Sequence, residues 1–70
     1  MNIVDVLKKE NLGKTYNVYL NEKYLGEWEV RTLETRKSNI VELCNEDGEW
    51  ISYEYFVSEM VEMDFREIKK

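Results

Sequence analysis

The chain has 70 residues, 43% of them hydrophobic and 36% charged, so it has enough apolar material to fold, but only as one domain with a thin core. It contains no histidine and one cysteine, which excludes Ser-His and Cys-His nucleophile pairs, most zinc sites and an internal disulfide. No apolar run is long enough to span a membrane, and the N-terminus is charged where a secretion signal would be apolar. We expect residues 1–70 to form a single cytoplasmic domain.

The formal charge of -5 is concentrated in the C-terminal part of the chain. Residues 42–67 contain nine acidic residues and one basic residue, Arg66, whereas residues 1–41 are close to neutral. A negative field of this kind repels nucleic acid and anionic membranes and attracts basic surfaces. We therefore expect no direct contact with DNA or a membrane, and the acidic part either keeps the protein soluble or faces a basic partner.

The first predicted element is a short amphipathic helix over residues 3–11. Asn2 can cap its N-terminus, and an apolar stripe starts at Ile3 and Val6 with helical spacing. Gly13 can take the left-handed conformation that ends such a helix. We expect the stripe to pack on a sheet.

After this helix the hydrophobic period changes from helical to two, which predicts β-strands. Five strands are expected, over residues 14–21, 27–34, 39–44, 49–54 and 61–68. Gly26 is a candidate for a β-bulge, and Asp47-Gly48 for a tight hairpin turn. Residues 55–60 are too short for a helical crossover and are predicted as one or two helical turns.

Short connections of this kind join antiparallel neighbours, because parallel strands need longer crossovers. Five short strands must also close or curl to avoid exposed edges. The predicted fold is α+β and mainly β: a short N-terminal helix followed by a five-stranded antiparallel SH3-like partly open barrel, with a helical turn before the last strand. The alternative is an open, twisted antiparallel sheet with the N-terminal helix packed across one face.

No combination of residues points to catalysis or to a bound metal. Cys44 has no partner base and is expected to be a small buried side chain, and the chain has no Gly-rich phosphate loop. The acidic turn matches a calcium-binding EF-hand loop only in part. Asn45, Asp47 and Glu54 fall at liganding positions, but Leu43 stands where an aspartate is required. We expect no enzymatic activity, no metal and no cofactor.

The aromatic residues around the acidic turn are the candidates for a binding surface. Two Trp, five Tyr and two Phe are many for a thin core, although aromatic residues at strand spacing belong first to the core. An exposed Trp50 beside a tyrosine would form an apolar platform of the kind enriched at protein interfaces. The predicted binding residues are Trp50, Glu46, Asp47, Glu49, Tyr24 and Tyr55.

Three stretches of the sequence carry a resemblance to known proteins: the N-terminal "MNIVDVLKKENLGK", the strand "WEV" and the closing "EMDFREI". In its organisation the chain resembles short acidic accessory proteins of phages and prophages of Gram-positive bacteria. It is more remotely similar to small phage proteins that sequester nucleotide signals of host defence systems, but no residue of those ligand sites can be matched here. The resemblance implies an accessory protein of the host cytoplasm that binds a host molecule, with anti-defence inhibitors among the candidates.

Three hypotheses follow. The first is a non-enzymatic interaction module whose acidic, aromatic-containing face binds a basic surface of a host protein, such as a nucleic-acid-binding protein. The second is a small-ligand binder that sequesters a nucleotide signal, with a local basic site drawn from Lys14, Lys23, Arg31, Arg36 and Lys37. The third is a structural homo-oligomer that pairs strand edges between chains.

Overall fold

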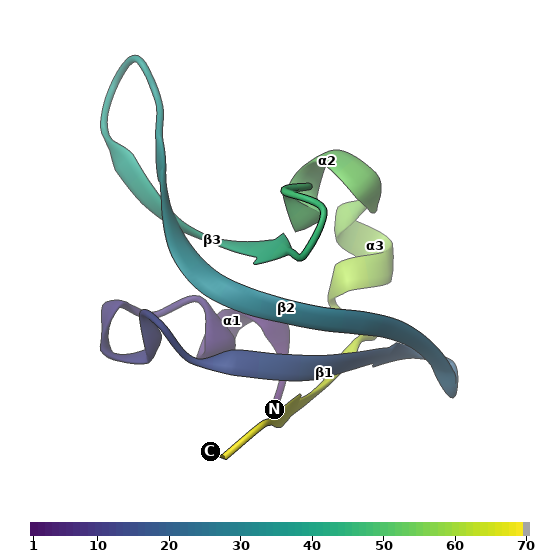
Figure 1. The fold of residues 1–70 in the computed structure, drawn as a ribbon. Coiled ribbons are helices and arrows are strands. Elements are labelled where there is room, and N and C mark those ends of the chain that lie inside the picture. Colours follow the sequence, from purple (N-terminus) through teal and green to yellow (C-terminus); the bar gives the residue numbers. More distant parts are fainter. Residues whose placement is uncertain (70) are drawn as a thin grey trace.

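The computed structural model describes residues 1–69 and forms an open, four-stranded antiparallel sheet with short helices (Figure 1). The strands are β1 Thr15–Leu20, β2 Lys23–Glu34, β3 Asn39–Asn45 and β4 Asp64–Glu67, in the sheet order β3-β2-β1-β4. The helical elements are α1 Ile3–Val6, the 3-10 turn η1 Lys9–Asn11, α2 Ile51–Glu54 and α3 Val57–Met60. Among residues 1–69, no helix combines the length and the apolar character that crossing a lipid bilayer requires.

One core joins the inner face of the sheet to the helices. It consists of Ile3, Val6, Tyr16, Val18, Trp28, Val30, Leu43, Ile51, Met63 and Phe65. The period-two alternation predicted for β1 and β2 is confirmed, because Tyr16 and Val18 are buried together with Trp28 and Val30. The expected burial of Cys44 is also confirmed, but its side chain lies on the outer face, opposite Glu29 of β2.

The predicted five-stranded SH3-like barrel is wrong, because the expected strand over residues 49–54 does not form. Trp50 makes a single bridge with Cys44 on β3, and the chain then turns into α2. Ile51 is fully buried and Tyr55 packs against the core, and this spacing of four is helical. A short apolar run fits a helical period as readily as an alternating one. Without the extra strand the sheet stays open, as in the alternative fold, but the N-terminal helix of that alternative is reduced to the single turn α1.

The predicted helix over residues 3–11 is interrupted at Leu7, where φ is -82° and ψ is 59°. The side-chain amide of Asn11 donates hydrogen bonds to the carbonyl oxygens of Asp5 and Val6, at 2.9 and 3.1 Å. A longer helix would need these two carbonyl groups for its own backbone bonds. The chain therefore forms one turn of α-helix, α1, and a separate 3-10 turn, η1.

The expected roles of Asn2 and Gly13 are confirmed in part. The side chain of Asn2 accepts a hydrogen bond from the backbone N–H of Asp5 at 3.0 Å and caps α1. Gly13 has the predicted positive φ, +89°, although it follows η1 and not a long helix. Its N–H donates to the carbonyl oxygen of Val30 at 2.9 Å, which ties the step into β1 to the middle of β2.

The first hairpin is tighter than the sequence predicted. Its loop is only Asn21 and Glu22, both with positive φ (50° and 70°), so β2 begins at Lys23 and reaches twelve residues. The bulge predicted at Gly26 is confirmed: the register shifts by one residue between Asn17 and Tyr19, and Gly26 has a φ of +94°.

The end of the chain follows the prediction in type but not in length. The helical turn expected over residues 55–60 is α3, which covers Val57–Met60. The strand expected over residues 61–68 is shorter than predicted, because β4 covers only Asp64–Glu67. Met63 and Phe65 are buried as predicted, but Val61 belongs to the turn after α3 and is 56% exposed.

Candidate interaction surfaces

The acidic turn between β3 and α2 is organised by Asn45. Its side-chain oxygen accepts hydrogen bonds from the backbone N–H groups of Asp47 and Glu49, at 3.0 and 2.9 Å. Its side-chain nitrogen donates to the Glu49 carboxylate at 3.0 Å. Within residues 1–69, no cluster of three or more His, Cys, Asp or Glu side chains is placed to hold a metal ion. The turn is thus an Asn-centred loop that presents carboxylates to solvent.

Two hollows adjoin this turn on the outer face of the sheet and share Glu27, Asn45 and Glu46. Their volumes are about 150 and 260 Å³. We call the combined feature the acidic trough. It is lined by Thr15, Tyr24, Leu25, Gly26, Glu27, Glu29, Arg31, Cys44, Asn45, Glu46 and Asp47.

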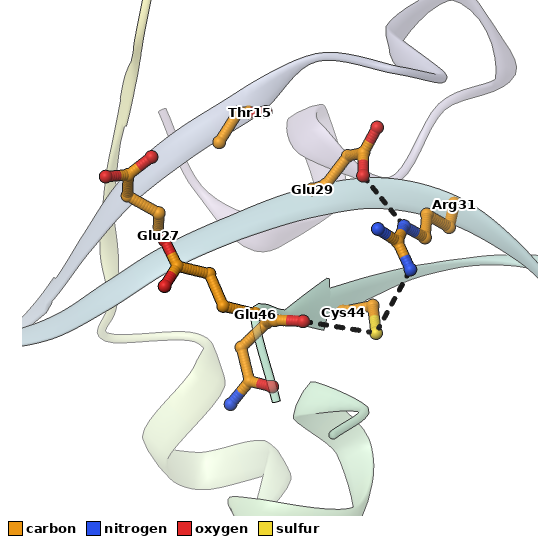
Figure 2. A pocket seen from close by; sticks show the side chains of 7 residues that line it. Thr15, Glu27, Glu29, Arg31, Cys44 and Glu46 are labelled. Atoms are coloured by element: carbon orange, nitrogen blue, oxygen red, sulfur yellow. Dashed lines mark hydrogen bonds and ion pairs between the residues drawn. The ribbon is translucent and has the colours of Figure 1, made fainter. Parts of the chain in front are cut away.

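Arg31 lies at one end of the acidic trough, and its guanidinium group already contacts Glu29 and Cys44 (Figure 2). Its Nε lies 2.7 Å from a Glu29 carboxylate oxygen, and Nη1 lies 3.8 Å from Sγ of Cys44. The hydrogen bond and charge of Glu29 raise the pKa of Arg31. Among residues 1–69, the carboxylates of Glu27, Glu46 and Asp47 have no ion-pair partner. The acidic trough therefore keeps a net negative charge.

Tyr24 forms the aromatic wall of the acidic trough and is 51% exposed. Its hydroxyl donates to the side chain of Asn17 at 2.9 Å, and its ring packs on Tyr19 with centroids 5.3 Å apart. Partial burial raises the pKa of Tyr24, and the carboxylates of Glu27 and Glu46 raise it further. The phenol therefore stays neutral beside these negative charges.

The six residues predicted to bind are divided between two regions. Tyr24, Glu46 and Asp47 meet in the acidic trough, and Glu49 belongs to the same turn. Trp50 is half-buried beside β3, and Tyr55 is half-buried against Trp28, so neither ring lines the trough.

A second surface lies on α2, α3 and the turn after α3. Tyr53 is 73% exposed, Phe56 78%, Val57 70% and Val61 56%. Tyr53 and Phe56 line one shallow hollow, and Val57 and Val61 are four residues apart on one side of α3. We call these four residues the apolar ridge.

The local fold forces the apolar ridge outward. Tyr55 and Met60 are partly buried against the core, and Phe56 and Val57 between them face solvent. The carboxylate of Glu59 accepts a hydrogen bond from the N–H of Phe56 at 2.8 Å and fixes the start of α3. The sequence prediction missed the apolar ridge. The spacing of four between Val57, in the predicted helical turn, and Val61, which was assigned to the following strand, is the signal that could have revealed it.

Comparisons of the chain with protein families, with curated proteins and with solved structures gave no match. We therefore infer function from the acidic trough and the apolar ridge.

Proposed function

We propose that the chain is a non-enzymatic interaction module that binds a basic, partly apolar surface of another protein through the apolar ridge. The supporting observation is that four large apolar side chains within residues 53–61 are each more than half exposed. Large exposed apolar side chains this close together in the sequence of a small protein are typical of an interaction site, and Tyr and Phe are enriched at interfaces. Their burial would provide most of the binding free energy.

Charge would select the partner. Residues 42–65 contain eight acidic residues and no basic one, and exposed Glu54 and Glu62 flank the apolar ridge. An acidic rim steers basic surfaces toward the ridge and repels acidic ones. The acidic trough adds three unpaired carboxylates beside Tyr24 and extends the negative field to the outer face of the sheet.

The resemblance to phage accessory proteins suggests the setting. There, the partner would be a protein of the bacterial host with a basic surface, such as a nucleic-acid-binding protein, and the module would act in the host cytoplasm. An inhibitor of a host defence protein fits this proposal, because masking a basic surface blocks its use by nucleic acid.

Capture from a lysate of a Gram-positive host tests the proposal when three baits are compared. The wild type and Val4→Ser, which changes a 71% exposed residue of α1, should recover the same protein. The double variant Phe56→Ser/Val57→Ser should lose it, and raised salt should weaken recovery by the first two baits. Equal recovery by all three baits would overturn the assignment of the ridge.

The geometry is less favourable to the alternative of a sequestered nucleotide. Of the five basic residues that could hold phosphate, Lys14 lies 4.0 Å from a Glu67 carboxylate and Arg31 lies 2.7 Å from Glu29. A phosphate at either position would have to compete with a carboxylate.

A further inference from the structure

The hydrogen bonds of β2 reveal which backbone groups of β3 face away from the sheet. The N–H of Val30 donates to the carbonyl of Lys14, and its own carbonyl accepts from Gly13, both at 2.9 Å. The backbone groups of Val30 therefore point toward β1, and its neighbour on β3, Leu43, belongs to a non-hydrogen-bonded pair. The backbone groups of Leu43 must point the other way, to the free edge of β3.

This edge is occupied at its C-terminal end. Two residues after Leu43, the N–H of Asn45 donates to the carbonyl of Glu49 at 3.0 Å, and Trp50 forms a bridge with Cys44. These contacts cover the end of β3 where the acidic turn begins.

The N–H of Leu43, the next backbone group that faces the edge, is covered by the side chain of Glu42. Glu42 is only 5% exposed, and its carboxylate accepts a hydrogen bond from the N–H of Leu43 at 3.0 Å. By the period of two, Asn39 and Val41 also direct their backbone groups to the free edge. Within residues 1–69, no hydrogen bond is formed by the N–H of either residue. The N-terminal half of β3 is therefore an unpaired strand edge.

We propose that residues 39–43 of β3 pair antiparallel with the same residues of a second copy of the chain. The two-fold axis would pass at Val41, so that Val41 pairs with Val41 of the second copy and the N–H of Leu43 donates to the carbonyl of Asn39. An unpaired edge is a template for another strand, and a two-fold contact of an edge with itself closes at a dimer. The bridge made by Trp50 sets the C-terminal limit of the pairing.

Charge complementarity selects the second copy as the occupant. Arg36 and Lys37 lie in the projecting loop that precedes β3 (Figure 1), whereas Glu46 and Asp47 follow its other end. Antiparallel pairing about Val41 brings the basic end of each strand beside the acidic end of the other, and this contact occurs twice. Parallel pairing would instead place like charges together.

The carboxylate of Glu42 limits the strength of this pairing. Because it holds the N–H of Leu43, it must turn away before Leu43 can bond to Asn39 of the second copy. Glu42→Ala removes this competitor. It should lower the dissociation constant of the dimer by about tenfold, which corresponds to about 1.4 kcal/mol.

Sedimentation equilibrium and amide hydrogen exchange of the whole chain, at concentrations up to about 1 mM, test the pairing. The wild type should dimerise, and exchange at Val41 should slow as concentration rises. Val41→Pro removes an N–H that β2 does not use, so it should keep the fold and remain monomeric. A wild type that stays monomeric, with exchange at Val41 independent of concentration, would overturn the proposal. So would a dimer that Val41→Pro leaves intact.

A charge-swap experiment does not depend on the proline variant. Arg36→Glu/Lys37→Glu and Glu46→Lys/Asp47→Lys each place like charges at both ends of the pair, so each alone should dimerise at least about tenfold more weakly than wild type. A mixture of the two variants restores attraction at both ends and should form a heterodimer of wild-type strength. A mixture as weak as its components would overturn the antiparallel register.

Discussion

The ring of Tyr55 packs edge-on against the indole of Trp28, with centroids 6.3 Å apart and ring planes at 69°. Trp28 is fixed on β2, because its ring N–H donates to the carbonyl oxygen of Leu25 at 2.9 Å. Tyr55 is the first of the two residues between α2 and α3, so this contact holds both single-turn helices to the sheet. It thereby positions the apolar ridge.

Tyr55→Ala is expected to lower the free energy of unfolding by about 2–3 kcal/mol, because it removes the contact with Trp28 and leaves a void at the core. Urea denaturation measures this loss. Tyr53→Ala is the matched control. It replaces the same residue type at a 73% exposed position and should change stability by less than about 0.5 kcal/mol. Similar losses in both variants would contradict the anchoring role of Tyr55.

The same contact explains where sequence reasoning about the fold failed. The alternation of apolar and polar residues correctly predicts strands β1 and β2, because the buried residues of each strand lie on one face with exposed or half-exposed residues between them. Residues 49–54 contain three hydrophobic residues, Trp50, Ile51 and Tyr53, in a run too short to distinguish a strand from a helix. Only the tertiary packing of Ile51 and Tyr55 on the sheet selects the helix, and this packing is not visible in a local pattern.

The candidate surfaces were predictable to a similar extent. The cluster of Tyr24, Glu46 and Asp47 followed from the acidic turn, although Glu27 and Glu29 of the same trough were not included. Trp50 was expected as the centre of the site, but its backbone bridge to β3 keeps it half-buried. The apolar ridge was missed because Tyr53 and Val61 were assigned to strands, and Phe56 and Val57 only to a helical turn. Its exposure depends on Tyr55 and Met60 occupying the inner positions on either side.

Tyr16→Phe is expected to raise the free energy of unfolding by about 1 kcal/mol. The hydroxyl of Tyr16 is buried and has no hydrogen-bond partner within residues 1–69. A buried polar group without a partner carries a desolvation cost that phenylalanine removes. Tyr24→Phe serves as control, since its hydroxyl does have a partner, Asn17, and its loss should not stabilise the protein. Urea denaturation measures the effect: the midpoint of Tyr16→Phe should rise while the m-value stays unchanged. A lower midpoint for Tyr16→Phe would contradict the prediction.

Glu22→Gly is expected to stabilise the first hairpin by about 0.5–1 kcal/mol. Glu22 has a φ of 70°, which is strained for a side chain with a Cβ atom but not for glycine. The resulting Asn-Gly loop is the one that two-residue hairpins prefer. Lys23→Gly, one position later and inside β2, should instead destabilise the fold by a similar amount. Thermal unfolding measures both effects. If the unfolding temperatures of the two variants shifted in the same direction relative to wild type, the prediction would be refuted.

Glu49 and Glu54 are expected to titrate as a linked pair. Hydrogen bonds from Asn45 and Glu54 lower the pKa of Glu49, while the hydrogen bond and the charge of Glu49 raise the pKa of Glu54. The contribution of Glu49 to stability is therefore lost as pH falls through its folded pKa. That of Glu54 is present at low pH and is lost as pH rises through its folded pKa.

Carboxyl carbon NMR titration measures both groups directly. In Glu49→Ala, the pKa of Glu54 should fall back toward its ordinary range, because the acceptor and the negative charge are gone. Glu46→Ala leaves both Glu49 and Glu54 in place, so the pKa of Glu54 should stay raised in that variant. A Glu54 pKa that ignores the loss of Glu49 would contradict the linkage.

The most direct test of the interaction proposal is an NMR titration of the labelled chain with a synthetic amphipathic peptide that carries lysine on one face and leucine on the other. The proposal predicts shifts concentrated in residues 53–62, an affinity that falls with salt, and at least about tenfold weaker binding by Phe56→Ser/Val57→Ser than by Val4→Ser. It also predicts no binding of the matching peptide with glutamate in place of lysine. Equal binding of both peptides, or shifts that avoid residues 53–62, would contradict it.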